Sequence, residues 1–82
     1  MIFSFKIDKP KDMKSTYVKL KHELESAGGT LAGDESNGRI TLMGIEGEYE
    51  TDVSHIIITI TKKPPLIPNR LIENEVRRFF ND

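Results

Sequence analysis

The segment from His55 to Phe80 constrains the fold more than any other part of the chain. It begins with HIIITITK, which is rich in β-branched residues and has isoleucine at alternate positions, as a strand with one buried face requires. Pro64 and Pro65 then end the strand, because proline has no backbone N–H to donate to a neighbouring strand. We therefore predict a strand over His55–Lys62 and a helix over about Pro68–Phe80. The strand residues expected in the core are Ile56, Ile58 and Ile60.

The predicted C-terminal helix has one apolar face and one charged face. Its apolar residues recur three or four positions apart, and they are Ile72, Val76, Phe79 and Phe80, with Leu71 at the flank. On the other side, Glu73 and Arg77 are four residues apart and Glu75 and Arg78 are three apart, spacings at which unlike charges on a helix attract. This pattern predicts a helix that packs its apolar face on the sheet.

A longer helix is predicted in the N-terminal part of the chain. Asp8 and Pro10 form a helix start signal, since proline is tolerated in the first helical turn. We expect the helix over about Lys11–Ala27, ending at Gly28-Gly29, where glycine readily adopts the left-handed conformation of a helix cap. Its apolar stripe consists of Met13, Tyr17, Leu20, Leu24 and Ala27, widened by Val18.

Alternation and turn residues predict four further strands. They cover about Met1–Ile7, Thr30–Asp34, Arg39–Met43 and Ile45–Glu50. The pair Asn37-Gly38 favours a tight primed hairpin turn between the second and third of these strands, and Gly44 permits a bend or bulge after the third. The inward-facing residues are expected to be Phe3, Phe5, Ile7, Ile40, Leu42, Ile45, Gly47 and Tyr49.

These segments follow one another in the order β-α-β-β-β-β-α within a single domain spanning residues 1–82. Strands joined by short turns pair antiparallel. The predicted fold class is therefore α+β, with a single curved antiparallel sheet and both helices packed on one of its faces.

Composition narrows the classes of protein that the chain can belong to. It has no cysteine, which leaves no disulfide and no thiolate metal ligand, and a net charge of −1. Bases gather in residues 1–22 and 53–82 and acids in residues 23–52, so we expect internal charge pairing and no nucleic-acid partner. No apolar run exceeds Ile56–Ile58 in length, and MIFSFKID lacks the features of a signal peptide. We expect a small soluble protein in the cytoplasm, with no membrane span.

The most conspicuous candidate ligands are Glu46, Glu48 and Glu50, which alternate along one predicted strand. Same-face neighbours on a strand lie about 7 Å apart. Three such carboxylates could bind Ca²⁺ or Mg²⁺ with help from other loops, could act as an acid–base pair, or could pair with Arg39 or Lys6 on adjacent strands. The plainest interpretation is a solvated outer face of the sheet, and we predict no metal and no cofactor.

The two histidines give no metal motif. His22 falls on the solvent side of the N-terminal helix, and His55 begins a strand close to Asp52, with which it could form a ligand or base pair. No G-x-S-x-G segment and no phosphate-binding glycine loop occurs. The sequence therefore identifies no catalytic residue, and it favours a binding or interaction domain over an enzyme.

Two regions are candidates for binding. On the outer face of the sheet, Ile2, Met43 and Ile57 are apolar among polar neighbours, and the simplest partner for them is a second copy of the chain, with another protein as the alternative. Between the sheet and the C-terminal helix, aromatic side chains could enclose a pocket for a small apolar ligand. The aromatic residues of this candidate pocket are Phe3, Phe5, Tyr49, Phe79 and Phe80.

The run from Gly38 to Phe80 resembles the small putative polyhydroxyalkanoic acid system (granule-region) proteins. The matching residues are Gly44 and Gly47 in a G-x-x-G step, the strand Ile56–Ile60, and Ile72-Glu73 followed by Val76. More loosely, a curved antiparallel sheet closed by a C-terminal helix is similar to the helix-grip architecture of lipid-binding proteins. The resemblance implies this fold and a tendency to expose apolar surfaces, and it implies no catalytic residue.

Overall fold

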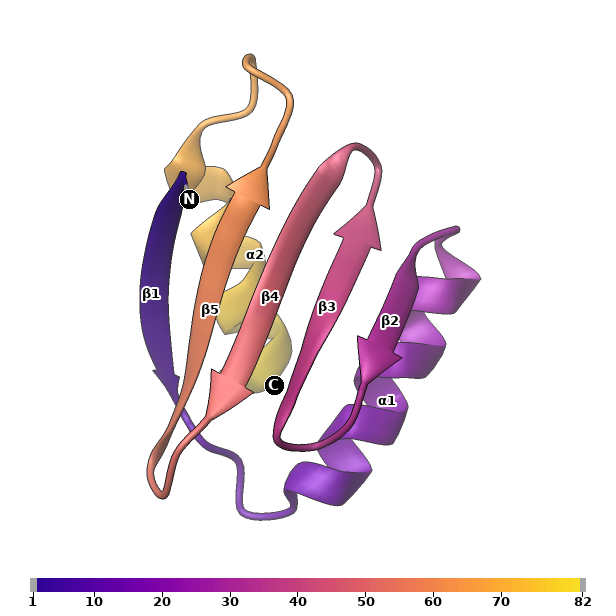
Figure 1. Cartoon of the computed structure of the whole chain (residues 1–82), viewed down its shortest axis with the longest axis vertical. Coiled ribbons are helices and arrows are strands. Elements are labelled where there is room, and N and C mark those ends of the chain that lie inside the picture. Colours follow the sequence, from indigo (N-terminus) through magenta and orange to yellow (C-terminus); the bar gives the residue numbers. More distant parts are fainter. Residues whose placement is uncertain (1, 82) are drawn as a thin grey trace.

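The computed structural model describes residues 2–81, which form a five-stranded antiparallel sheet with two helices on one face (Figure 1). The α+β class and the order of the elements are as predicted. The elements are β1 (Phe3–Asp8), α1 (Met13–Ser26), β2 (Thr30–Gly33), β3 (Asn37–Leu42), β4 (Ile45–Thr51), β5 (His55–Lys62) and α2 (Asn69–Asn81). The predicted first strand began at Met1, which lies outside the described residues.

The strands are ordered β1-β5-β4-β3-β2 across the sheet. Strands β2 to β5 form a meander, whereas β1 lies at the far edge and pairs with β5, so that Phe5 is opposite Ile58. The loop after β1 leads the chain along one end of the sheet to α1, which lies beside β2 at the opposite edge (Figure 1). The first and last strands are therefore neighbours, a pairing that local sequence patterns do not reveal.

The inner face of the sheet carries the apolar residues, as the alternation predicts. On β5, Ile56 is only 1% exposed, and Ile58 and Ile60 are buried beside it. Tyr49 of β4 pairs with Ile58 from the other side and is also buried. Helix α2 lies behind β4 and β5, while α1 lies behind the β2 and β3 edge (Figure 1). The two helices thus cover different parts of one face.

The predicted beginning of α1 is wrong, and its predicted end is confirmed. Asp12 caps the helix, because its Oδ1 accepts a hydrogen bond from the Ser15 N–H at 3.0 Å, so Pro10 lies in the preceding loop. At the other end, Gly28 has a φ of 88° and the next N–H, from Gly29, bonds to the Leu24 carbonyl at 2.8 Å.

Two residues of the predicted α1 stripe do not face the core. Val18 is 60% exposed, and Ala27 is exposed at the end of the helix. Met13 and Leu24 are buried, and Tyr17 and Leu20 are half-buried. The apolar stripe of α1 is consequently narrower than its sequence suggests, because the helix contacts the sheet along one edge only.

The primed turn predicted at Asn37-Gly38 is not formed. Gly33 pairs with Gly38, and the loop between them is held by the Asp34 carboxylate, which accepts N–H bonds from Ser36 at 2.8 Å and Asn37 at 3.1 Å. Gly38 is needed for another reason. A Cβ there would lie 2.5 Å from the hydroxyl oxygen of Tyr49, whose ring covers the glycine.

The tight primed turn occurs instead at Met43-Gly44. Leu42 and Ile45 pair directly across it, and the two central residues have φ angles of 51° and 81°. Positive φ at both positions defines a type I′ turn, whose twist matches that of the flanking strands. Met43 is the one non-glycine residue with positive φ among the described residues, and its side chain is 80% exposed.

Replacing Met43 should therefore stabilise the fold. We expect Met43→Asn to raise the free energy of unfolding by about 1 kcal/mol, because asparagine tolerates the left-handed conformation better than methionine. Urea denaturation measures the change. Met43→Ala is the control, since alanine retains a Cβ without any side-chain polar group, and it should give no comparable gain. An equal gain from alanine would contradict backbone strain as the cause.

Candidate functional site

A groove separates the two helices above the inner face of the sheet. Its volume is about 460 Å³, within the range of about 300–1,000 Å³ that is usual for small-molecule sites. Strands β3, β4 and β5 form its floor, α1 one wall and α2 the other. The layer between sheet and helices is therefore partly hollow rather than filled by its own side chains.

The walls and floor of the groove are apolar. Leu20 and Leu24 project from α1, and Ile72 and Val76 project from α2. In the floor, Gly47 lies between larger residues, and a Cβ there would be 3.1 Å from the Thr59 carbonyl and 3.2 Å from Ile60 Cδ1. The charged lining residues are exposed, and they are Glu23, Glu48 and Glu75. The interior of the groove thus favours an apolar occupant.

Two tyrosines at one end of the groove hold the β2–β3 loop. The Tyr17 hydroxyl donates to the Gly33 carbonyl at 2.8 Å, and the Tyr49 hydroxyl donates to the Asp34 carbonyl at 2.6 Å. Both tyrosines line the groove, yet their polar ends are satisfied by this loop. Burial raises the pKa of Tyr49 to about 12, with smaller contributions from Tyr17 and Asp34. The Tyr49 phenol is therefore neither an acid nor a base at neutral pH.

A contact between the helices spans the groove. The Lys19 ammonium of α1 lies 5.6 Å from the centre of the Phe79 ring of α2. Phe79 in turn packs edge-to-face on Phe80, with ring centres 5.1 Å apart. Such a cation–aromatic contact at an exposed site contributes about 0.5–1 kcal/mol. It is weak enough to open, and among the described residues Lys19 forms no ion pair.

The structure brings together only part of the predicted aromatic pocket. Tyr49, Phe79 and Phe80 line the groove, whereas Phe3 and Phe5 do not. The latter two stack on each other on β1, with ring centres 5.9 Å apart, and the Arg77 guanidinium lies 5.4 Å from the Phe5 ring. The reason is the strand order, because β1 lies beyond β5 and is covered by α2.

Sequence reasoning missed the contribution of α1 to the groove. Tyr17, Leu20 and Leu24 belong to the apolar stripe of that helix, which we assigned wholly to the core. Ile40 of β3 was likewise predicted to face inward but not to line a pocket. The stripe itself was the available signal, but a stripe does not show whether a second helix packs against it.

The residues of the predicted outer surface lie apart from one another. Ile2 is 43% exposed at the sheet edge, where its N–H donates to the Ile60 carbonyl at 2.8 Å. Ile57 is half-buried on the outer face, opposite Lys6, which is four residues from Ile2 and hence about 13 Å further along the strand. Met43 projects from the β3–β4 turn. The three residues do not form one continuous patch.

Two of the three acidic residues of β4, Glu46 and Glu48, are paired with bases. Glu48 Oε2 lies 2.6 Å from the Arg39 guanidinium, so the pairing with Arg39 that the sequence left open is formed at this residue. Glu46 lies 3.7 Å from the Lys62 ammonium, at an irregularity in the pairing of β4 with β5. Within residues 2–81, no three His, Cys, Asp or Glu side chains are placed to share a metal ion.

Asp52 and His55 meet in the β4–β5 turn. The Asp52 Oδ1 accepts N–H bonds from Ser54 at 2.8 Å and His55 at 2.6 Å, and it lies 3.7 Å from the His55 Nδ1. These backbone bonds lower the pKa of Asp52, with the nearby His55 adding a smaller effect. The carboxylate therefore holds the turn, which accounts for its position. His22 is exposed on α1, as predicted.

Comparison with models of protein families, with curated proteins and with solved structures finds no match to this chain. The resemblance to the granule-region proteins therefore stays a prediction. Between residues 2 and 81, neither helix is both long and apolar enough to cross a bilayer. The groove and its residues are thus the basis on which a function can be proposed.

The raised pKa of Tyr49 predicts a loss of stability at alkaline pH. Its pKa is about 12 when folded, against a usual value of 10.0. Between these values the unfolded chain loses the phenolic proton more readily, so a rise in pH favours unfolding. We expect the free energy of unfolding to fall between pH 10 and pH 12 in chemical denaturation.

Tyr49→Phe tests the assignment. At neutral pH it should lower the free energy of unfolding by about 1 kcal/mol, because the Asp34 carbonyl loses its donor. It should also flatten the alkaline fall, since phenylalanine does not ionise. An undiminished fall in this variant would show that another group causes it.

Proposed function

We propose that the protein binds a small, elongated apolar molecule in the groove and carries it without changing it chemically. The observation that carries this proposal is a cavity of about 460 Å³ lined on the floor and both walls by aliphatic and aromatic side chains. Removal of apolar surface from water stabilises a complex by about 25 cal/mol per Å². When an apolar ligand enters the groove, its own apolar surface and that of the lining are both removed from water, and both contribute to this stabilisation.

The tyrosine hydroxyls of the lining are hydrogen-bonded within the protein, which favours an apolar ligand over a polar one. The hydroxyls of Tyr17 and Tyr49 are already bonded to the Gly33 and Asp34 carbonyls. Polar groups in the middle of a ligand would therefore find no hydrogen-bond partner in the groove, and each would cost about 1–3 kcal/mol of binding free energy. The exposed carboxylates of the lining lie where solvent reaches them.

Lys19 favours a ligand with an acidic head. Its ammonium projects across the groove to the Phe79 ring rather than to a carboxylate of the protein. A ligand whose apolar chain occupies the groove and whose carboxylate reaches this opening would meet a positive charge. A fatty acid is the simplest molecule with that chemistry.

Binding explains the lining better than catalysis does. Among the described residues, the lining includes no histidine, serine, threonine, aspartate or lysine. A nucleophile paired with a base is consequently not brought to the groove. The resemblance to granule-region proteins and to the helix-grip architecture implies apolar surfaces and agrees with this proposal, but the argument rests on the groove.

A fluorescent fatty-acid probe tests the groove directly. We expect the probe to bind the protein and Leu20→Trp to weaken binding at least tenfold, because the indole fills space between the helices. The matched control is Val18→Trp, a change on the same helix at an exposed residue outside the groove lining. It should leave the affinity within twofold of the original.

The same experiment can overturn the proposal. Absence of probe binding, or equal losses in the two tryptophan variants, would do so. Sedimentation equilibrium covers the remaining case, in which a second copy of the chain occupies the groove. If the protein is a dimer that Leu20→Trp dissociates, and if it does not bind the probe, the groove is an interface between two copies of the chain and not a ligand site.

The acidic head is tested by pairing a fatty-acid probe with its methyl ester. We expect the acid to bind up to fivefold more tightly than the ester, as an exposed ion pair contributes about 0.2–1 kcal/mol. Lys19→Met should remove this difference while leaving the ester affinity unchanged. Lys14→Met is the control on the exposed side of α1 and should retain the difference. A preference for the acid that survives Lys19→Met would contradict the role of this ammonium.

A further inference from the structure

The loops at the two ends of the sheet differ in charge. Loops 27–29, 43–44 and 63–68 lie at one end, which we call the proline end, uppermost in Figure 1. None of these three loops contains an aspartate or glutamate. The loops at the opposite end, 9–12, 34–36 and 52–54, contain Asp12, Asp34, Glu35 and Asp52 against two bases, Lys9 and Lys11. Among these six loops, acidic residues are thus confined to one end of the sheet, where they outnumber the bases.

The proline end also carries exposed apolar side chains. Leu66 is 93% exposed in the β5–α2 loop, and Met43 is 80% exposed in the β3–β4 turn. The two loops are adjacent, since a Cβ on Gly44 would lie 3.4 Å from Pro64 Cγ. Met43 occupies this turn although its positive φ is unfavourable for a residue with a side chain.

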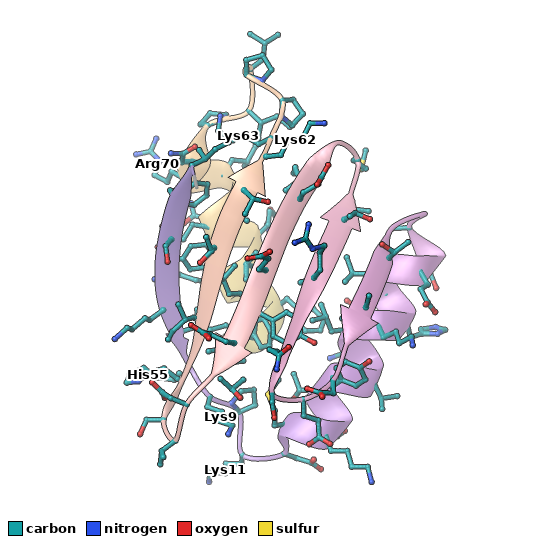
Figure 2. The ribbon with its side chains drawn as sticks, viewed as in Figure 1. Lys9, Lys11, His55, Lys62, Lys63 and Arg70 are labelled. Carbon is teal, nitrogen blue, oxygen red and sulfur yellow. The ribbon has the colours of Figure 1, made fainter. Side chains whose placement is uncertain are left out.

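Three basic residues surround the β5–α2 loop. Lys62, Lys63 and Arg70 gather about it at the proline end, away from Lys9, Lys11 and His55 (Figure 2). The Lys63 ammonium donates to the Ile67 carbonyl at 2.7 Å, which braces the loop behind Leu66. Lys62 lies 3.7 Å from Glu46 but its side chain is 70% exposed. The apolar tip is therefore flanked by positive charge.

The groove extends to the same end. Leu42 and Ile45, which flank the β3–β4 turn, line it, as do Ile67 and Leu71 beside the β5–α2 loop. Leu71 is itself exposed in the first turn of α2. A molecule leaving the groove here would pass the exposed apolar side chains of the two loops.

We propose that the proline end docks on an anionic lipid membrane. Leu66 and Met43 enter the interface between headgroups and acyl chains, and the exposed Lys62 and Arg70 face the negative headgroups, with the charge of the half-buried Lys63 behind them. Apolar burial combined with positive charge is the combination that a membrane surface of this kind binds. This proposal rests on the proposed function of the groove. When the proline end is docked, the groove opens toward the membrane, which supplies the apolar ligand.

The opposite end offers a matched contrast. Val53 is 94% exposed in the β4–β5 turn, so it presents an apolar side chain as fully as Leu66 does. It follows directly on Asp52, in a turn near the other acidic loops. An anionic surface repels that end. Exposure of an apolar side chain is thus common to both ends, and charge distinguishes them.

Vesicle flotation tests the docking. The intact protein should float with vesicles in which phosphatidylglycerol replaces part of the phosphatidylcholine, and should stay behind with phosphatidylcholine alone. Leu66→Glu should lower the vesicle partition coefficient at least tenfold, whereas Val53→Glu should leave it unchanged. Both residues are so exposed that neither change disturbs packing, and circular dichroism verifies the fold.

The charge contribution needs its own pair of variants. Lys62→Gln combined with Arg70→Gln should lower partitioning by about tenfold or more, and added salt should lower it as well. Lys11→Gln, at the opposite end, should have no effect. Equal binding to neutral vesicles, no binding to anionic ones, or equal losses in the Val53 or Lys11 variants would overturn the proposal.

Probe binding separates this proposal from that of ligand binding. Leu66→Glu should retain the fatty-acid probe, because Leu66 is not part of the groove lining. If Leu66→Glu loses vesicle binding but keeps its affinity for the probe, the variant has impaired docking and not ligand binding. If the protein fails to bind vesicles but binds the probe, only the docking proposal is wrong. If it binds vesicles but not the probe, only the proposed groove function is wrong.

Discussion

Strand β5 has a hydrogen-bonded neighbour on each side, and its inner face is the support on which the rest of the structure packs. Ile56, Ile58 and Ile60 are all buried there, between β1 and β4. Burial of one such side chain stabilises the folded state by about 1.5–3 kcal/mol, against a usual total of about 5–15 kcal/mol for a domain. This strand supports α2, pairs with the edge strand β1 and forms part of the floor of the groove.

The groove exists because the two helices are supported at different places. Helix α2 lies behind β4 and β5 and also contacts β1, where the Arg77 guanidinium lies over the Phe5 ring. Helix α1 is tied to the opposite edge, where the Tyr17 hydroxyl binds the β2–β3 loop. Each helix is held by its own edge of the sheet, and the Lys19–Phe79 contact joins the two helices across the opening. The hollow is thus a product of the strand order rather than of missing side chains.

Most elements could be predicted because local chemistry determines them. The alternation of apolar and polar residues determines β4 and β5, and the glycine after α1 determines where that helix ends. Strand β5 has the predicted bounds. The turns were harder. Asn37-Gly38 has the sequence of a primed turn, but the Asp34 carboxylate and the Tyr49 ring favour a longer loop at that place. At Met43 the direct pairing of the flanking strands imposes positive φ on a residue that does not prefer it.

The candidate site depended on contacts that are distant in the sequence, and it was therefore predicted only in part. Tyr49, Phe79 and Phe80 were recognised as aromatic residues of the inner layer, but the pairing of β1 with β5 removes Phe3 and Phe5 from the groove. The wall formed by α1 was missed, since an apolar stripe looks the same whether it faces a filled core or a groove.

The pairing of β1 with β5 also has a consequence for how the chain reaches its fold. The strands β2 to β5 form a meander of short connections, which can assemble from local encounters. Strand β1 can join only after β5 exists, so closing the β1 edge requires contact between distant parts of the sequence, a slow step by comparison. During synthesis, Phe3 and Phe5 are made long before their partner strand and have no place to bury until it emerges. The most vulnerable moment of the molecule therefore comes before β5 is complete, when its first strand is an apolar segment without a sheet.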